Sequence, residues 1–427
     1  MVSEPSDAPL SGDEADDSAG AITRRLRRGT ALVFAGSVLG YGINYLLTPL
    51  LGRLVTPETF GTFAAILATA TMFIGASTLR LEIFAASARS AAHRINAQLL
   101  ALLFAAAASI AISAVITAII LVTGASPLWL LAGPMVFMGS LQLVASVLYS
   151  HERRYATLGL SNAIQGGGTG LFQVVLALVS PTAFALVGGF LLARAQWVLP
   201  LLSLRPGRMP LRSTWRRARG FASTAGASAL VNSAGSQVPI LLTTSMFGTV
   251  GAGIFAMAVR MLLGPIQIMA QAIGTTSVGE IGRLAARHDP KLLPTVNGLV
   301  RQLAVLMGVV ALGAALLGPY LANALLGNAW EDVGTTLRVL SVGAFAQGVG
   351  SPLAQILNLT KRPGILMAWD ATRVVLFTAI FIGIPLAGGG MIAAATAYSG
   401  AMVILYAALY LLVRRACRQN TLARTSN

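Results

Sequence analysis

The stretch AQLLALLFAAAASIAISAVITAIILVT (97–123) decides the fold class, because it runs for 27 residues without a charged side chain. An α-helix rises about 1.5 Å per residue, so this stretch can cross the roughly 30 Å hydrocarbon core of a bilayer. The whole chain is similar in character: 56% of its 427 residues are hydrophobic, 10% are charged, and the mean hydropathy is +0.76. A soluble domain carries about 25% charged residues. The composition therefore predicts an integral membrane protein with helical spans.

Twelve such apolar stretches follow one another, so we expect an all-α polytopic membrane protein with both termini on one side. The stretches are 29–52, 59–79, 97–123, 128–149, 158–179, 182–203, 221–246, 251–276, 303–326, 335–358, 365–387 and 389–412. Residues 1–20 contain six of the 14 acidic residues and many small or polar ones, which predicts a disordered acidic tail. We expect a basic linker at 205–220 and a basic tail at 414–427.

The positively charged residues predict the orientation. Twenty-five of the 30 Lys and Arg residues fall in the tails and in alternate loops that would share one side of the membrane. Loops on the other side hold only Arg53, beside Glu58, Glu331 and Asp332. Cytoplasmic loops are enriched in Lys and Arg, so both termini are predicted to be cytoplasmic. The net charge of +16 is thus better explained by topology than by nucleic-acid binding.

The sequence also divides into two similar halves. Arg28-Gly29 corresponds to Arg219-Gly220, and GTFA at Gly61 corresponds to GIFA at Gly253, with offsets of 191 and 192 residues. Parallel six-helix repeats predict a transporter whose pathway lies between two lobes. We assign the N-lobe to 21–204 and the C-lobe to 221–413.

Charged residues inside spans are candidate site residues, because each costs about 2.5–3.5 kcal/mol at the membrane centre. We select Arg194, Arg260, Asp370 and Arg373, with Arg80 and Glu82 at the inner end of the second span. Asn44, Asn232 and Gln237 are polar residues within spans that we add to this set. Most of these charges are positive, which suits an anionic passenger.

Structural interpretations remain open for several of these residues. Arg338 lies close to a span end and can extend its side chain to water. Asp370 and Arg373 are spaced i, i+3 and can neutralise each other. Arg260 has no acid in its own helix, so it either binds an anion or pairs with Asp370 of another helix. The glycines of GGGTG (166–170) lack a following Lys and indicate close helix packing, as GSVLG (36–40) also does.

No metal or cofactor site is expected. The chain has a single cysteine, Cys417, and its histidines, His93, His151 and His288, lie in three separate polar connectors. The sequence does not decide between H⁺ and Na⁺ as a coupling ion, or whether there is one.

Several motifs carry a family resemblance. TPLLGRLVTPETFGTFAAI (48–66) and STLRLEIFAAS (77–87) resemble the opening of Wzx-type polysaccharide flippases of the multidrug/oligosaccharidyl-lipid/polysaccharide (MOP) exporter superfamily. ALVNSAGSQVPILL (229–242) and FGTVGAGIFAMAVRMLLGPIQIMAQAIG (247–274) are similar to that family's second half. The similarity touches most of 24–415, and Leu81 replaces a more common Tyr.

The resemblance implies two six-helix lobes in a V around a central cavity, as in MATE transporters. It implies a lipid-linked oligosaccharide passenger, usually on undecaprenyl pyrophosphate, and a bacterial inner membrane. Membrane lipids, a polysaccharide polymerase and glycosyltransferases of the same pathway would be partners, and no nucleic acid would be.

Three other functions fit the sequence less well. A cation-coupled drug antiporter needs a carboxylate inside a lobe, and the first six spans contain only Glu82. A peptidoglycan-precursor flippase often carries extra spans, for which this chain has no room. A membrane glycosyltransferase or ligase would need placed carboxylates or a large outer loop, so we expect no enzyme activity.

Overall fold

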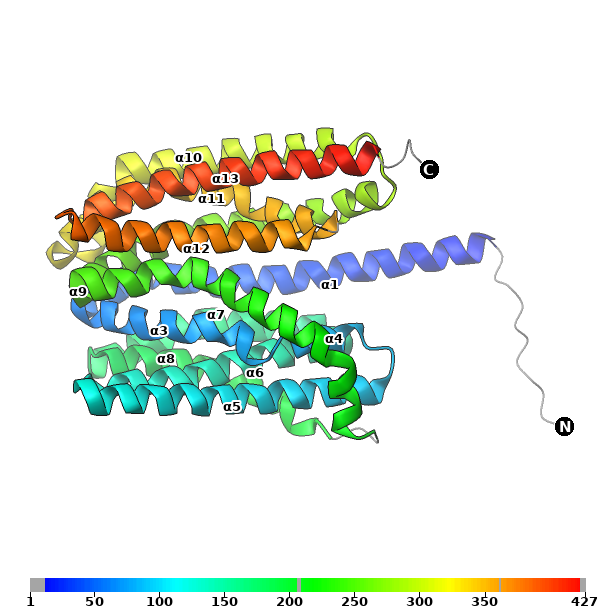
Figure 1. The fold of residues 1–427 in the computed structure, drawn as a ribbon, viewed down its shortest axis with the longest axis horizontal. Coiled ribbons are helices and arrows are strands. Elements are labelled where there is room, and N and C mark those ends of the chain that lie inside the picture. Colours follow the sequence, from blue (N-terminus) through cyan, green and yellow to red (C-terminus); the bar gives the residue numbers. More distant parts are fainter. Residues whose placement is uncertain (1–11, 206–208, 361, 423–427) are drawn as a thin grey trace.

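The computed structural model describes residues 12–205, 209–360 and 362–422, and their side chains except those of 12–28, 267, 268, 270–278 and 363. Every regular element in these ranges is helical (Figure 1). The α-helices are α1 (Gly12–Leu46), α2 (Thr48–Leu54), α3 (Pro57–Ser77), α4 (Leu81–Ser87), α5 (Ala91–Thr123), α6 (Ala132–His151), α7 (Tyr155–Val179), α8 (Ala183–Ala195), α9 (Leu211–Ala286), α10 (Leu292–Leu326), α11 (Glu331–Leu359), α12 (Pro363–Leu386) and α13 (Met391–Leu422). Short 3₁₀ helices are η1 (Pro127–Leu131), η2 (Gln196–Ser203) and η3 (Asn328–Trp330).

The predicted spans all fall on helices. Ten helical segments of the described chain are long and apolar enough to cross a membrane, and one of them, Leu211–Ile266, contains one predicted span and most of the next. The chain changes direction inside this segment at Gly248, whose φ of 72° and ψ of −179° are accessible essentially only to glycine. The remaining predicted span, 335–358, lies within α11. The polytopic all-α fold class is therefore confirmed.

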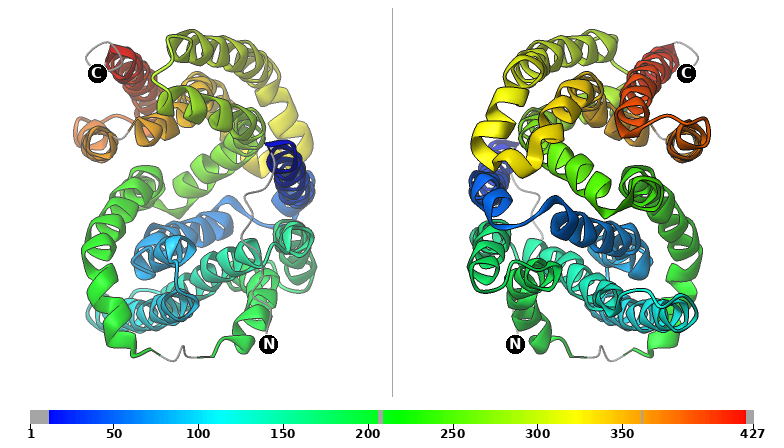
Figure 2. Two further views of the ribbon diagram at one scale, coloured as in Figure 1. Left: turned by 90° about the vertical axis from the view of Figure 1, so that its right-hand side faces the viewer. Right: turned by 90° about the vertical axis from the view of Figure 1, so that its left-hand side faces the viewer.

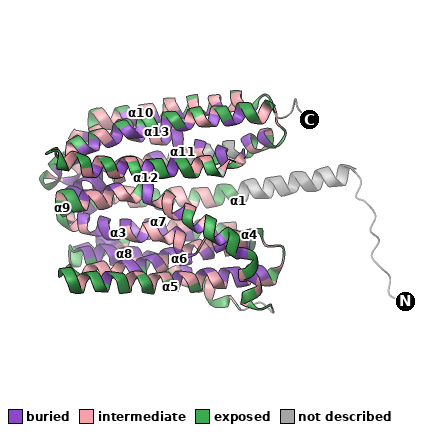
Figure 3. Ribbon diagram, in the orientation of Figure 1, coloured by how far each residue is buried: buried purple, intermediate pink, exposed green. Residues whose placement is uncertain are grey.

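Two groups of helices make up the molecule. Seen along the helices, α3 and α5–α8 form one group and α10–α13 the other, with α1 between them, and α9 runs from the first group to the second (Figure 2). In Figure 1, α1 begins and α13 ends at the same end of the molecule, as an even number of crossings requires. Exposed residues follow the outward helix faces (Figure 3). Many large apolar side chains are among the exposed residues, for example Leu121 and Val179 at more than four-fifths exposure. Such a surface suits contact with lipid.

Glycines let α1 and α7 pack backbone to backbone. A Cβ atom added to Gly36 would lie 1.9 Å from the Gly159 carbonyl oxygen, and one added to Gly166 would lie 2.6 Å from the Gly40 carbonyl carbon. The predicted packing roles of GSVLG and GGGTG are thus confirmed, since small residues allow such close approach in membranes.

The structure differs from the prediction at two connecting segments. Residues 12–20 of the predicted disordered tail are the beginning of α1, while 1–11 lie outside the described residues. Acidic residues at a helix N-terminus interact favourably with the helix dipole, which explains a helical start in this acidic segment.

The second difference is the predicted linker, of which residues 211–220 are the first turns of α9. His93 Nδ1 lies 2.8 Å from the Thr214 hydroxyl, and the Trp215 and Phe104 rings are 5.1 Å apart, so these turns pack on α5. The apolar residues Trp215, Ala218 and Ala222 recur at helical spacing and lie in or against one buried cluster, which explains why this basic segment is helical.

Candidate functional site

A cavity of about 480 Å³ lies between the two groups of helices. Residues of α1, α3, α7, α8, α9, α11, α12 and α13 line it, so both halves of the chain contribute. Three arginines, Arg194, Arg260 and Arg373, lie in its wall, and no Asp or Glu is among the described lining residues. Guanidinium groups remain charged at any physiological pH, so this cavity is strongly cationic.

Arg260 is held by neutral oxygen atoms from the start of the chain. Its Nε donates to the Thr48 hydroxyl at 3.0 Å, and its Nη2 donates to the Asn44 side-chain oxygen. Its guanidinium carbon also lies 5.8 Å from the centre of the Phe60 ring. No carboxylate contacts it among the described residues, so its charge is not neutralised by an ion pair.

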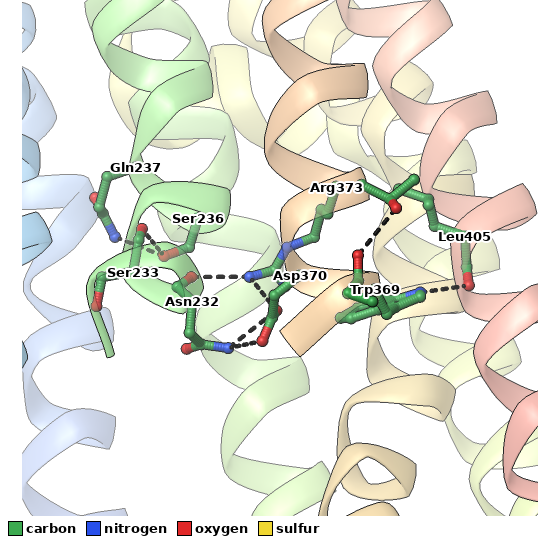
Figure 4. A network of polar contacts seen from close by, with 10 residues as sticks. Asn232, Ser233, Ser236, Gln237, Trp369, Asp370, Arg373 and Leu405 are labelled. Carbon is green, nitrogen blue, oxygen red and sulfur yellow. Dashed lines mark hydrogen bonds and ion pairs between the residues drawn. The ribbon is translucent and has the colours of Figure 1, made fainter. Parts of the chain in front are cut away.

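Asp370 pairs instead with Arg373, so the alternative in which it neutralises Arg260 is wrong. The Arg373 Nη2 lies 3.1 Å from Asp370 Oδ1 and donates to the Asn232 carbonyl oxygen at 2.9 Å (Figure 4). The Asn232 amide donates to both Asp370 oxygens, at 3.1 and 3.0 Å. The i, i+3 spacing brings the two charges together within one helix, as the sequence allowed.

The Arg373 guanidinium also packs against Trp369 and Gly235. It lies 5.1 Å from the centre of the Trp369 ring, and Trp369 is itself fixed by donating its indole N–H to the Leu405 carbonyl. A Cβ atom on Gly235 would lie 2.4 Å from Arg373 Nε. This Nε is buried and has no hydrogen-bond partner among the described residues.

Arg194 is the least compensated of the three. Its guanidinium carbon lies 3.5 Å from the centre of the Phe190 ring, and its Nη1 donates to the Phe190 carbonyl at 3.3 Å. Its Nε is buried without a partner among the described residues. A positive charge on an aromatic face within a helical turn keeps outward N–H groups available to an anion.

The other predicted site residues divide into two sets. Asn44 and Gln237 line the cavity, and Asn232 reaches it through Asp370 and Arg373. Arg80 and Glu82 do not line it; Arg80 Nη1 lies 3.7 Å from Glu82 Oε1, at the turn between α3 and α4. That turn has left-handed backbone at Leu79 and Arg80, which directs Arg80 back toward Gly75 of α3.

Sequence reasoning missed the tyrosines and one amide of the cavity wall, which are Tyr41, Tyr45, Gln347, Tyr398 and Tyr406. Gln165 and Gln173, which the sequence shows as uncharged polar residues inside spans, also line the cavity. One signal was present: Tyr41, Asn44, Tyr45 and Thr48 share one helical face of an otherwise apolar span. The side-chain oxygens of Gln173 and Gln347 are buried without a partner among the described residues. Such amides can accept hydrogen bonds from sugar hydroxyls.

The two halves of the chain contact each other at the end of the molecule that the charge pattern predicts to be outer. Arg53 donates from Nε to the Leu325 carbonyl at 2.9 Å and from Nη2 to the Ala324 carbonyl at 2.7 Å. The Trp330 indole donates to the Gly52 carbonyl at 2.7 Å. We call these contacts, with the Gly61–Gly253 crossing of α3 and α9, the outer seal.

Within the described residues, no group of three or more His, Cys, Asp or Glu side chains could hold a metal ion. The chemical resources of the cavity are therefore fixed positive charge, aromatic faces and amides. These are suited to holding an anionic, hydroxyl-bearing molecule, and no carboxylate is among the described lining residues.

One family of known proteins matches the sequence. The profile of a family described as "Polysaccharide biosynthesis protein" matches residues 50–335. No curated protein matches in sequence.

Solved structures share the fold. An inward-facing multidrug resistance MATE family transporter of the MOP superfamily has 14% identity and a TM-score of 0.67, covering 90% of this chain and 98% of its own. The lipid II flippase MurJ in an inward closed conformation has 12% identity and a TM-score of 0.66, covering 90% of each chain. A MOP superfamily transporter from Pyrococcus furiosus has 14% identity and a TM-score of 0.62, covering 92% of this chain and 96% of its own.

Proposed function

Because this chain belongs to the polysaccharide biosynthesis protein family, with the fold of MOP superfamily transporters, we propose that it flips a lipid-linked oligosaccharide across a bacterial inner membrane. The carrier lipid would be undecaprenyl pyrophosphate. The observation that carries this proposal is the cavity with three arginines and no lining carboxylate among the described residues. The proposed passenger would supply the missing negative charge.

A pyrophosphate suits this cavity chemically. Its oxygens accept charge-assisted hydrogen bonds, which are roughly twice as strong as neutral ones, and a guanidinium can offer two parallel N–H groups. Arg194 and Arg260 are the two lining cations without a carboxylate partner among the described residues, so they would bind the anion. Arg373, already paired with Asp370, would orient the sugars beside Tyr398 and Tyr406.

Alternating access would move the headgroup. The outer seal would close one end of the cavity, so the headgroup would enter from the predicted cytoplasmic side while the lipid tail stays in the bilayer. Opening of the seal would then release it outward. Both termini would be cytoplasmic, and the polymerase and glycosyltransferases of the pathway would act before and after this step.

The drug antiporter alternative fits the cavity less well. A cationic drug would meet three arginines and no carboxylate among the described lining residues, and Glu82 lies outside the wall. The lack of a carboxylate pair among the described lining residues also argues for a transporter over a glycosyltransferase.

Transport in proteoliposomes tests this function. Purified protein is reconstituted with an undecaprenyl-pyrophosphate-linked oligosaccharide, and a membrane-impermeant glycosidase reports how much reaches the outer leaflet. Arg194→Gln and Arg260→Gln should each lower transport about tenfold or more, because each removes charge-assisted bonds.

The matched control is Arg338→Gln. Arg338 is an exposed arginine of α11 that donates to the Ala315 carbonyl and does not line the cavity. Equal transport by all four proteins would remove the arginines from the mechanism. Export of cationic dyes without movement of the glycolipid would favour the antiporter.

A further inference from the structure

Arg260 connects the two halves of the chain as well as lining the cavity. It belongs to α9, and its two acceptors lie 212 and 216 residues earlier, at Thr48 and Asn44. The Thr48 hydroxyl in turn donates to the Asn44 backbone carbonyl at 3.0 Å, which holds both acceptors in place. We call this group of three residues the inter-half tie.

The tie and the outer seal are at opposite ends of one short helix. Thr48 is the first residue of α2, which follows α1 after a single turn residue, Leu47. Gly52 and Arg53, near the other end of this seven-residue helix, make the seal contacts to Trp330 and to the end of α10. Because a helix of two turns moves as a unit, a displacement of Thr48 also displaces Arg53.

The hydrogen bonds of the inter-half tie are weaker than those that an anion would accept from Arg260. Both acceptors, an amide oxygen and a hydroxyl, are neutral, and phosphate oxygens accept stronger bonds from a guanidinium. Arg260 also lines the cavity in which an anion would bind. An arriving anion would therefore compete with Asn44 and Thr48 for the same N–H groups.

We propose that the inter-half tie is the element that links occupancy of the cavity to the outer seal: an anion that binds Arg260 releases Asn44 and Thr48, and α2 is then free to leave α10. This inference rests on the proposed function, because it takes an anionic headgroup as the ligand. Asn44 and Thr48 are then competitors of the substrate for Arg260, and the seal weakens when the substrate is bound.

The direction in which Asn44→Ala changes anion affinity distinguishes this role from a purely structural one. Linkage is reciprocal, so a weaker tie must raise anion affinity by the factor by which the anion weakens the tie. Asn44→Ala should therefore bind an anion more tightly, by up to about tenfold. If Asn44 only positions Arg260, the same change should bind it more weakly. Under the proposal, Asn44→Asp, which adds a competing carboxylate, should lower anion affinity by at least the factor by which Asn44→Ala raises it.

Closure of the outer seal can be measured with a designed disulfide. A Cβ atom on Gly52 would lie 3.4 Å from the Leu326 Cβ, close to the usual 3.5–4.5 Å of a disulfide. Gly52→Cys with Leu326→Cys, in a Cys417→Ala background that removes the natural cysteine, reports seal closure as cross-link yield. The full-length protein in lipid nanodiscs is oxidised briefly with and without inorganic pyrophosphate, and pyrophosphate binding is measured by calorimetry.

The matched control is Asn162→Ala. The Asn162 amide donates to the Ser37 hydroxyl at 3.0 Å, a bond of the same kind between α7 and α1 that stays within one half of the chain. We expect pyrophosphate to lower the cross-link yield two- to fivefold in the parent and in the control. Asn44→Ala should lower it without pyrophosphate, and Asn44→Asp should keep it high in both conditions.

The outcomes distinguish the two proposals. Weaker pyrophosphate binding by Asn44→Ala, with a parental cross-link yield, would overturn the tie and leave the anion site intact. Absence of pyrophosphate binding to the parent protein would count against the proposed function. In that case the cross-link yield of Asn44→Ala alone would test whether the tie controls the seal. A yield equal to that of the parent would refute this role of the tie.

Discussion

Gly61 and Gly253, which hold equivalent places in the two sequence halves, make the same backbone contact in opposite directions. A Cβ atom on Gly61 would lie 1.8 Å from the Thr249 carbonyl oxygen, and one on Gly253 would lie 1.9 Å from the Pro57 carbonyl oxygen. Thr249 follows Pro57 by 192 residues, as Gly253 follows Gly61. Such reciprocal contact is what a two-fold axis between repeats produces. The GTFA and GIFA segments therefore meet near that axis, at the outer seal.

Alanine at either glycine should open the outer seal. The added methyl group would meet a backbone carbonyl, which cannot move aside as a side chain can, so α3 and α9 must separate. We expect Gly61→Ala and Gly253→Ala to lower the yield of the designed disulfide between positions 52 and 326 at least threefold. Gly313→Ala is the control, since a Cβ there meets nothing within 4 Å. A parental yield in both variants would show that this crossing does not hold the seal.

Arg53 should contribute to the seal through the end of α10. It satisfies two backbone carbonyls of a helix C-terminus, where a positive charge is favourable. The side chain is exposed, so we expect a modest effect of about 1 kcal/mol, seen as a severalfold lower cross-link yield in Arg53→Ala. Arg53→Lys should be intermediate, because an ammonium lacks the forked geometry. Arg338→Ala, which loses a bond within one half, should match the parent.

Gly235 should set the position of Arg373. A methyl group there would come within 2.8 Å of three guanidinium atoms, and a flexible side chain can yield where backbone cannot. Gly235→Ala should thus displace Arg373 and strain its pairing with Asp370. Transport should fall severalfold, while thermal stability of the purified protein changes little. Gly220→Ala, in the same helix with free space around it, should behave as the parent. Loss of folded protein would instead indicate that the Asp370–Arg373 pair is mainly structural.

The topology can be tested with reporter fusions. A fusion at Asn427 should give the signal of a cytoplasmic reporter, and an insertion at Ala329 should give that of an exported one, because loop cations lie almost entirely on one side. The same signal at both positions would refute the twelve-span arrangement and the outer location of the seal.

The spans were predictable from the sequence, and so was the local pair of Asp370 and Arg373. Apolar length decides whether a segment crosses a bilayer, and an i, i+3 spacing decides whether two charges in one helix can meet. The helical start of α1 at residues 12–20 was not predicted, nor was the packing of 211–220 on α5. In both segments, polar composition concealed a helix whose stability comes from its dipole or from a narrow apolar face.

What the sequence determined by itself was the solvent, namely lipid around the apolar spans, and the predicted side on which the loop cations collect. These follow from hydropathy and charge, which are summed over local stretches of chain. Only the tertiary structure decided which arginines of the cavity wall have no carboxylate partner among the described residues, namely Arg194 and Arg260. Arg260 lies 212 residues from Thr48 and 110 from Asp370, and either could have been its partner. The packing of α9 beside α1 places Arg260 next to Thr48 and Asn44. Contacts between distant helices depend on how their faces fit and not on the spacing of residues along the chain.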